Sequence, residues 1–280
     1  MLAWPFPFNA QVRCLIALSD SYTPAYTVHP GTGPYLVLLH GFLSSSRQWL
    51  HNLSTLSAVC QPITVDLYGH GASPAPITPE AYLPESYICA LERLRCSLGI
   101  QHWFVAGYSL GAGIAIRYAY QHPHRVLAHV FTNSASAFAD NNQVTRWRQD
   151  AVAHQQRILQ NGLAAVRRIP VHPRFAKRLP ADLYDLLTED ARSLSPLAVA
   201  QTLSVTTPNA CIRPIAALNP RPALLCYGQL EKRFEPYKVW AERHMVNLSV
   251  TTLQAGHAVN MEDSNGFNHA VTQFIRQHTP

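Results

Sequence analysis

The stretch "VAGYSLGAG", residues 105–113, decides the fold. It ends a short apolar run, "HWFVAG" (102–107), and opens an apolar segment with helical spacing. A reactive serine at so sharp a strand-to-helix turn needs neighbours without bulk two positions away, and Gly107 and Gly111 supply that room around Ser109. The helix start behind it offers backbone N–H groups and a positive dipole end. The pattern predicts a nucleophilic serine; alone it would also suit a tight turn with an N-cap serine.

Short apolar runs alternate with segments of helical spacing on both sides of this stretch. That alternation is typical of a mostly parallel sheet with helical crossovers. Eight runs are expected to be strands: 11–18, 25–28, 35–41, 62–66, 102–107, 125–133, 222–228 and 248–253. Helices are expected over four segments: 84–98, about 110–121, 236–245 and about 263–277. The sequence therefore predicts an α/β fold, with an eight-stranded sheet and helices on both faces.

The alternation stops between residues 134 and 220, where helical segments are broken by prolines. An insertion of this kind between two sheet strands is expected to be a helical lid over the strand ends. We therefore divide the chain into a core of residues 1–133 and 221–280 and a lid of residues 134–220. The lid holds ten Arg and Lys residues against six Asp and Glu residues, which is most of the net charge of +6. Arg146, Arg148 and Arg167 are candidates for holding a substrate carboxylate.

Composition limits the class of protein. With 280 residues and 48% hydrophobic side chains, the chain can bury one large core. The positive charge forms no block, so nucleic acid is not an expected partner. The six cysteines form no C-x-x-C pair, and neither a secretory leader nor an apolar run long enough to span a membrane is found. We expect a soluble cytoplasmic protein that acts on a small molecule, away from membranes, in an oligomeric state that the sequence does not indicate.

A serine hydroxyl needs an adjacent general base. His257, in "LQAGHAVNMED" (253–263), follows the last predicted strand and is the expected base for Ser109. Acyl transfer also needs donors aimed at the developing oxyanion. The turn "LLHGFLSSSRQW" (38–49) follows the third predicted strand and places the backbone N–H of Phe42 where it can act together with that of Leu110.

Four motifs occur in order and at suitable separations: "HGF", "DLYGHGAS", "GYSLGAG" and "GHAVNME". Together they resemble the α/β-hydrolase superfamily over almost the whole chain. The resemblance implies an α/β-hydrolase fold with an inserted lid, a serine nucleophile and no metal or other cofactor. Asp66 and His70, in the second motif, are interpreted as structural residues of a glycine-rich turn.

The acid that orients the histidine usually lies, in this superfamily, just beyond the strand after the lid, often as G-x-x-D. Here "YGQLEKRF" (227–234) places Glu231 at that position. Two interpretations stay open. In the first, Glu231 is the acid that orients His257. In the second, Glu231 is a solvated loop charge paired with Lys232 or Arg233, and Asp140, after the preceding strand, is the acid.

A narrower resemblance concerns the C-terminal part. "GQLEKRF" and "AGHAVNMEDSNGFNHAVTQFI" look like 2-succinyl-6-hydroxy-2,4-cyclohexadiene-1-carboxylate synthases, menaquinone-pathway lyases of this fold, and "GYSLG" also occurs there. Those lyases tend to have arginine after the elbow, where this chain has Ala112 and Gly113, and aspartate in place of Glu231.

Three functions fit these observations. The first is a serine hydrolase of a carboxylic ester or related acyl bond, with Ser109 as nucleophile, His257 as base and Glu231 as its orienting acid. The second is a cofactor-free lyase that uses the same three residues for proton abstraction. The third is a ligand-binding member of the fold without useful turnover.

Overall fold

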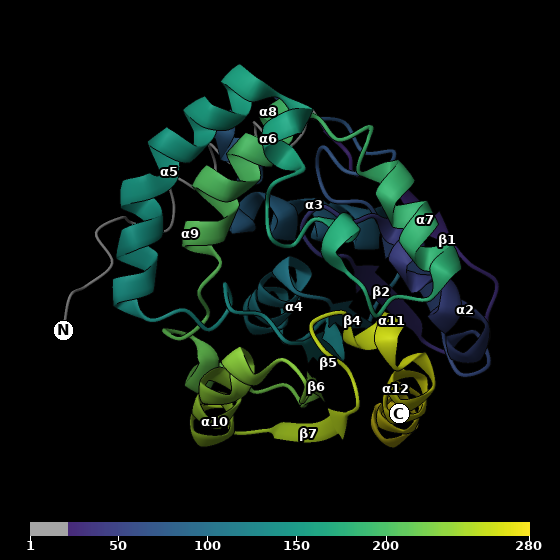
Figure 1. Ribbon diagram of the computed structural model, residues 1–280. Coiled ribbons are helices and arrows are strands. Elements are labelled where there is room, and N and C mark those ends of the chain that lie inside the picture. The colour runs from purple at the N-terminus through teal and green to yellow at the C-terminus, as the bar shows by residue number, and fades with distance from the viewer. Residues whose placement is uncertain (1–21) are drawn as a thin grey trace.

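Seven strands form one sheet in the computed structural model, which describes residues 22–280 (Figure 1). Their order across the sheet is β1-β3-β2-β4-β5-β6-β7. The strands are β1 (Tyr26–Val28), β2 (Tyr35–Leu39), β3 (Gln61–Val65), β4 (Trp103–Gly107), β5 (Val126–Thr132), β6 (Ala223–Gly228) and β7 (Leu248–Leu253). All pairs are parallel except that of β1 with β3. Seven of the predicted strands are thus confirmed, and the eighth, over 11–18, lies outside the described residues.

The central strands are buried on both faces because helices cover each side. Leu36 and Leu38 of β2 pack in one apolar cluster with side chains of α2 (Leu50–Leu56) and α12 (Ser264–His278). Val37 and Leu39, which point to the opposite face, pack with side chains of α3 (Pro84–Ser97) and α4 (Leu110–Gln121). Because successive side chains point to opposite faces, one strand packs against both layers of helices.

The remaining elements of the core are short or peripheral. They are the helices α10 (Glu235–His244) and α11 (Val259–Glu262) and the 3₁₀ turns η1 (Ser46–Trp49), η2 (Pro79–Tyr82) and η6 (Lys232–Phe234). The four predicted helices outside the insertion correspond to α3, α4, α10 and α12. No helix among residues 22–280 is both long and apolar enough to cross a membrane.

The insertion between β5 and β6 is helical. It contains α5 (Asn141–Asn161), α6 (Leu163–Val166), η3 (Pro173–Phe175), α7 (Ala181–Asp190), α8 (Pro196–Gln201), the π-helical turn η4 (Thr202–Thr206), α9 (Thr207–Asn209) and η5 (Ala216–Leu218). In Figure 1, α5, α6, α8 and α9 lie together at the upper left and α7 at the upper right. Its apolar cluster includes Ile158, Val166 and Leu194, and packs on Leu43 in the turn after β2. That the insertion acts as a lid stays a prediction.

Candidate active site

Ser109 sits in a strained turn between β4 and α4. Its φ of 51° and ψ of −111° lie outside the regions that side chains favour. The flanking glycines are required by contact: a Cβ on Gly107 would lie 2.2 Å from the carbonyl oxygen of Gly111, and one on Gly111 would lie 2.6 Å from that of Leu39. The turn therefore exposes the serine side chain at the carboxyl end of the central strand, the geometry of a nucleophile elbow.

Three side chains from three loops form a continuous row at this turn. Nε2 of His257 lies 2.9 Å from Oγ of Ser109, and Nδ1 of His257 lies 2.9 Å from Oε2 of Glu231. A carboxylate can only accept, so Nδ1 carries the proton in the neutral ring and Nε2 is free to accept from the serine hydroxyl. The pairing of β6 with β7 sets Gly228 opposite Leu253, which brings the loops of Glu231 and His257 to one edge of the sheet.

Asn133 holds Glu231, a role that no motif in the sequence indicates. Its amide nitrogen donates to Oε2 of Glu231 and to the carbonyl of Gly228, both at 3.0 Å, and its amide oxygen accepts from the N–H of Gly228 at 3.0 Å. Asn133 is fully buried at the end of β5. Next to it, the hydroxyl of Thr132 accepts from the N–H of Ser109 at 3.2 Å. The signal in the sequence was a pair of polar residues closing the apolar strand "RVLAHVFTN".

The electrostatics of Glu231 favour its charged form. Burial alone would raise its pKa, but the hydrogen bond and charge of His257, the hydrogen bond from Asn133 and the charge of Arg233 outweigh burial, so the pKa is lowered from its ordinary value. The side chain of Glu231 is 14% exposed and that of Arg233, 3.9 Å away, is 85% exposed. A contact of that kind adds little energy. Glu231 is therefore mainly a partner of His257 and Asn133 rather than a solvated loop charge.

Asp140, the alternative acid, has a different role. It is exposed at the N-cap of α5, where Oδ1 accepts from the N–H of Gln143 at 2.8 Å. Within residues 22–280 no hydrogen bond or ion pair joins it to His257. Its charge near the helix start is a normal capping interaction.

The turn that carries Phe42 lies beside Ser109. Leu39 and Gly107 are paired in register between β2 and β4, so Phe42 and Leu110 each follow three residues beyond a matched pair of strand positions. A Cβ on Gly41 would lie 2.6 Å from the ring of Tyr108 and 3.1 Å from Cβ of Ser109. The N–H of Leu110 opens α4 and has no acceptor within its own helix. The turn thus lies against Tyr108 and Ser109. That the N–H groups of Phe42 and Leu110 act together stays a prediction.

Buried amides connect this turn to the loop of His257. Gln48 accepts from the N–H of Gly41 at 3.2 Å. Asn260, three residues after His257, donates to the carbonyl of Gln48 at 3.2 Å and to Oδ1 of Asn52 at 3.0 Å. Gln48, Asn52 and Asn260 are fully buried, where hydrogen-bonded networks specify one arrangement. No local pattern in the sequence predicts this network, because its polar side chains come from separate turns.

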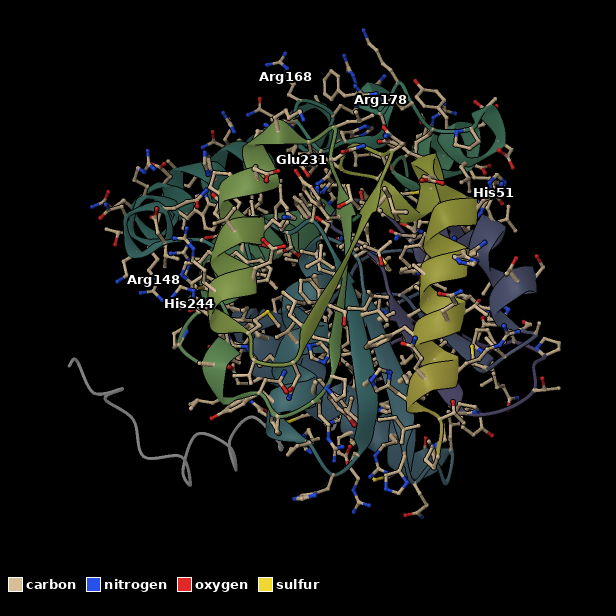
Figure 2. The ribbon with its side chains drawn as sticks, turned by 90° about the horizontal axis from the view of Figure 1, so that it is seen from below. His51, Arg148, Arg168, Arg178, Glu231 and His244 are labelled. Atoms are coloured by element: carbon tan, nitrogen blue, oxygen red, sulfur yellow. The ribbon has the colours of Figure 1, made fainter. Side chains whose placement is uncertain are left out.

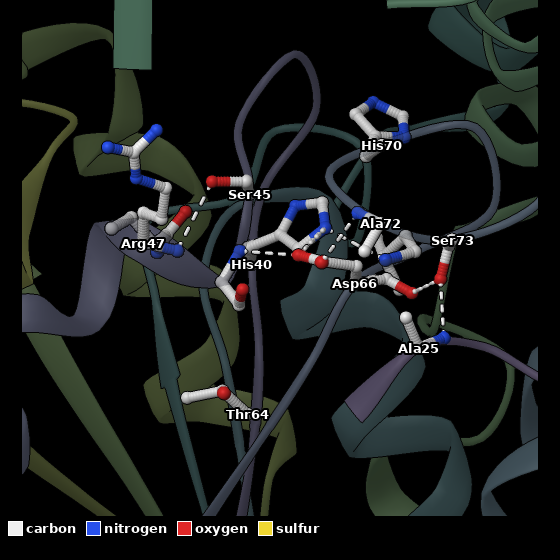
Figure 3. Close-up of polar contacts among 12 residues, drawn as sticks. Ala25, His40, Ser45, Arg47, Thr64, Asp66, His70, Ala72 and Ser73 are labelled. Carbon is white, nitrogen blue, oxygen red and sulfur yellow. Dashed lines mark hydrogen bonds and ion pairs between the residues drawn. The ribbon is translucent and has the colours of Figure 1, made fainter. Parts of the chain in front are cut away.

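Asp66, His40 and His70 form a second polar cluster (Figure 3). Asp66 accepts from the N–H of Ser46 at 2.7 Å and of Ala72 at 3.0 Å. His70 accepts at Nε2 from the N–H of Leu43, whose φ of 58° is also strained. Burial lowers the pKa of His40 and lowers that of His70 to about 3. These side chains hold turns, which agrees with the structural interpretation of Asp66 and His70.

Residues 34–263 match the model of the alpha/beta hydrolase fold, and the chain belongs to that family. In the described part of the chain, no three His, Cys, Asp or Glu side chains gather to hold a metal ion.

Two relatives are 33% and 37% identical to the chain, but only over short segments of it. The chain is 37% identical over 101 residues to epoxide hydrolase 3 of Siraitia grosvenorii, covering 36% of this chain and 32% of that protein. It is 33% identical over 134 residues to the (Lyso)-N-acylphosphatidylethanolamine lipase of Mus musculus, covering 42% and 39%. The matches thus span well under half the length of these relatives.

A solved structure of similar fold is that of MenH from S. aureus. Its TM-score is 0.80 at 20% identity, over 91% of this chain and 99% of that one. At such identity the likeness concerns the fold.

Proposed function

We propose that this protein is a serine hydrolase that cleaves a carboxylic ester or a related acyl bond of a small molecule. The observation that carries the proposal is the row from Ser109 through His257 to Glu231, with both hydrogen bonds at 2.9 Å. A nucleophile, a base and an orienting acid in hydrogen-bond contact are the arrangement that acyl transfer requires. The strained turn of Ser109 supports it further.

The proposed reaction runs in two halves. Oγ of Ser109 attacks the substrate carbonyl carbon while Nε2 of His257 takes the hydroxyl proton, and the N–H groups of Phe42 and Leu110 receive the oxyanion. The bond to the leaving group breaks, and His257 returns the proton to the departing oxygen. Water then attacks the acyl-serine with His257 again as base, which releases the acid and restores Ser109. Glu231 keeps His257 in the required tautomer and stabilises its cationic form.

A cofactor-free lyase is the second candidate, because the fold matches MenH of S. aureus over nearly the whole of both chains. In that reaction Ser109 would act as a proton acceptor and would form no acyl intermediate. Burst kinetics on an activated ester separate the two: a burst equal to the enzyme concentration indicates an acyl-serine.

The deciding experiment is a panel of short and long p-nitrophenyl esters, run beside an epoxide and the menaquinone-pathway intermediate, on wild type and Ser109→Ala. We expect ester hydrolysis and fluorophosphonate labelling by the wild type, and loss of both in the variant with unchanged folding. Ester hydrolysis fully retained in Ser109→Ala would refute the assignment of the nucleophile.

The proposed substrate carries a carboxylate. Arg178 of the insertion supports this, because its Nη1 lies 2.9 Å from the point that a Cβ on Gly256, the neighbour of His257, would occupy. Of the candidates from the sequence, Arg148 donates to Oδ1 of Asn209 instead. Figure 2 shows Arg178 and Arg168 at the same end of the molecule.

We expect Arg178→Gln to raise KM for a carboxylate-bearing ester by about tenfold at low salt and to leave a neutral ester of equal size unchanged. Arg168→Gln, which removes an exposed charge from the same insertion, is the matched control. Equal effects of the two variants on both esters would mean that Arg178 does not bind the carboxylate of the substrate.

A further inference from the structure

The loop that carries His257 is held by a carboxylate that the proposed chemistry does not use. This loop joins β7 to α11. The backbone N–H of Gly256 donates to Oε2 of Glu262 at 2.7 Å, and the N–H of Ala258 donates toward Oε1 at 3.3 Å. One carboxylate therefore accepts from the residues immediately before and after His257.

The backbone of Glu262 closes the same loop. Its N–H donates to the carbonyl of Ala258 at 2.7 Å, so main chain and side chain both fasten the segment. A Cβ on Gly256 would lie 3.2 Å from each carboxylate oxygen and 2.9 Å from Nη1 of Arg178. The bare face of Gly256 thus lets both the carboxylate and the guanidinium approach the main chain. Hydrogen bonds from N–H groups to an ionised carboxylate are the stronger kind.

We propose that Glu262 is a positioning residue, which fixes the main chain of His257 while Glu231 fixes its ring. The inference rests on the proposed role of His257 as base. The ring must contact Ser109 and Glu231 at the same time, each at 2.9 Å, and a shift of about 1 Å in such an arrangement costs about a hundredfold in rate. A carboxylate that grips both flanking peptides removes the loop motion that would produce such a shift.

Asp263 provides a matched comparison within the same segment. Its Oδ1 accepts from the N–H of Gly266 at 3.0 Å and its Oδ2 is 3.3 Å from the N–H of Gln254. It therefore also binds two main-chain N–H groups, but at the start of α12 and three residues before His257. Replacing it removes interactions of the same kind without freeing the peptides that flank His257.

The test compares Glu262→Gln with Asp263→Asn in the full chain. An amide can accept only one of the two N–H groups, and its NH₂ faces the other. We expect Glu262→Gln to lower kcat and the rate of fluorophosphonate labelling by about 10- to 100-fold, with KM within about threefold of wild type. Asp263→Asn, whose amide can accept from only one of the N–H groups of Gly266 and Gln254, should lower the melting temperature and keep kcat within about threefold. Glu262→Asp, which keeps both acceptors, serves if the glutamine variant does not fold, and should fall between wild type and Gln.

A second readout does not depend on turnover. The proton NMR signal of the Nδ1–H of His257, hydrogen-bonded to Glu231, should broaden or disappear in Glu262→Gln and persist in Asp263→Asn. Unchanged kcat and an unchanged signal in Glu262→Gln would overturn the proposal, as would equal losses of kcat in the two variants. If wild type neither hydrolyses esters nor reacts with the probe, the proposed function fails, and the NMR comparison still tests the positioning of His257.

Discussion

The pair of His257 and Glu231 differs from the pair of His40 and Asp66, although all four residues follow strands of the same sheet. The nearest nitrogen and oxygen of the pair are 2.9 Å apart in the first and 3.9 Å in the second. The side chain of His257 is 30% exposed, whereas that of His40 is fully buried.

The ring nitrogens explain the contrast. In His40, Nδ1 donates to the carbonyl of Gly41 at 2.7 Å and Nε2 accepts from the N–H of Leu67 at 2.8 Å. In His257, one nitrogen meets a carboxylate and the other meets the hydroxyl of Ser109. When both ring nitrogens of a histidine are hydrogen-bonded to backbone groups, neither nitrogen is free to exchange a proton with a substrate or a nucleophile. Acid–base chemistry thus depends on what the second nitrogen faces, rather than on the presence of a His and an acid.

The largest expected effect comes from Glu231→Gln. The amide cannot stabilise the cationic ring and favours the wrong tautomer, so kcat should fall by a factor that approaches the roughly 10⁴ of the aspartate-to-asparagine change in chymotrypsin-type proteases. Steady-state ester hydrolysis measures it, with circular dichroism to verify the fold. Glu231→Asp should be intermediate, because it restores a carboxylate on a shorter side chain.

Asp140→Asn is the control for that experiment. The amide keeps an acceptor for the N–H of Gln143 at this exposed cap and removes only the charge. The rate should therefore change by less than about tenfold, or under about 1.4 kcal/mol of barrier. If Asp140→Asn were the crippling change and Glu231→Gln nearly silent, the acid would be the residue after β5, and the comparison of the two pairs would fail.

Asp66→Asn should act on stability instead of rate. The carboxylate accepts from two N–H groups, and an amide satisfies only one of them, so the free energy of unfolding should fall by about 1 to 3 kcal/mol. Urea denaturation measures the loss, and kcat per folded molecule should stay within about threefold. A drop in kcat as large as that of Glu231→Gln would give Asp66 a part in the chemistry.

The last expected effect is a pH dependence of stability from His70. Burial, and next the electrostatic interaction with His40, lower its pKa to about 3, whereas the unfolded chain titrates near the ordinary value of 6.5. Between these values the unfolded state binds a proton that the folded state does not, so the stability is present above pH 6.5 and is lost as the pH falls toward 3. The slope is at most about 1.4 kcal/mol per pH unit from this group.

Replacing His70 by Gln should flatten that dependence relative to wild type, as measured by the midpoint of urea unfolding at pH 5 to 7. Parallel curves for the two proteins would show that His70 is not held neutral by burial.

The sequence by itself determined the elements whose cause is local. Glycine is required at positions 107 and 111 because a side chain there would collide with backbone atoms near Ser109 or in the adjoining strand. The alternation of apolar runs predicted seven strands and four helices that the structure contains. The choice of His257 as the base rested on its place after the last predicted strand and on the order serine, acid, histidine along the chain. Steric limits and side-chain periodicity act over short stretches, so they can be seen without knowing the fold.

Only the tertiary structure shows which of Glu231 and Asp140 contacts His257. Both follow a parallel strand, but Asn133 at the end of β5 reaches across to Glu231, 98 positions later, while Asp140 lies at an exposed helix start. The hydrogen bonds of Glu262 to the loop of His257 and the amide network around Gln48 could not be predicted from the sequence either. Such contacts depend on which loops the parallel sheet brings together at its carboxyl edge, and that proximity has no signature in the spacing of residues along the chain.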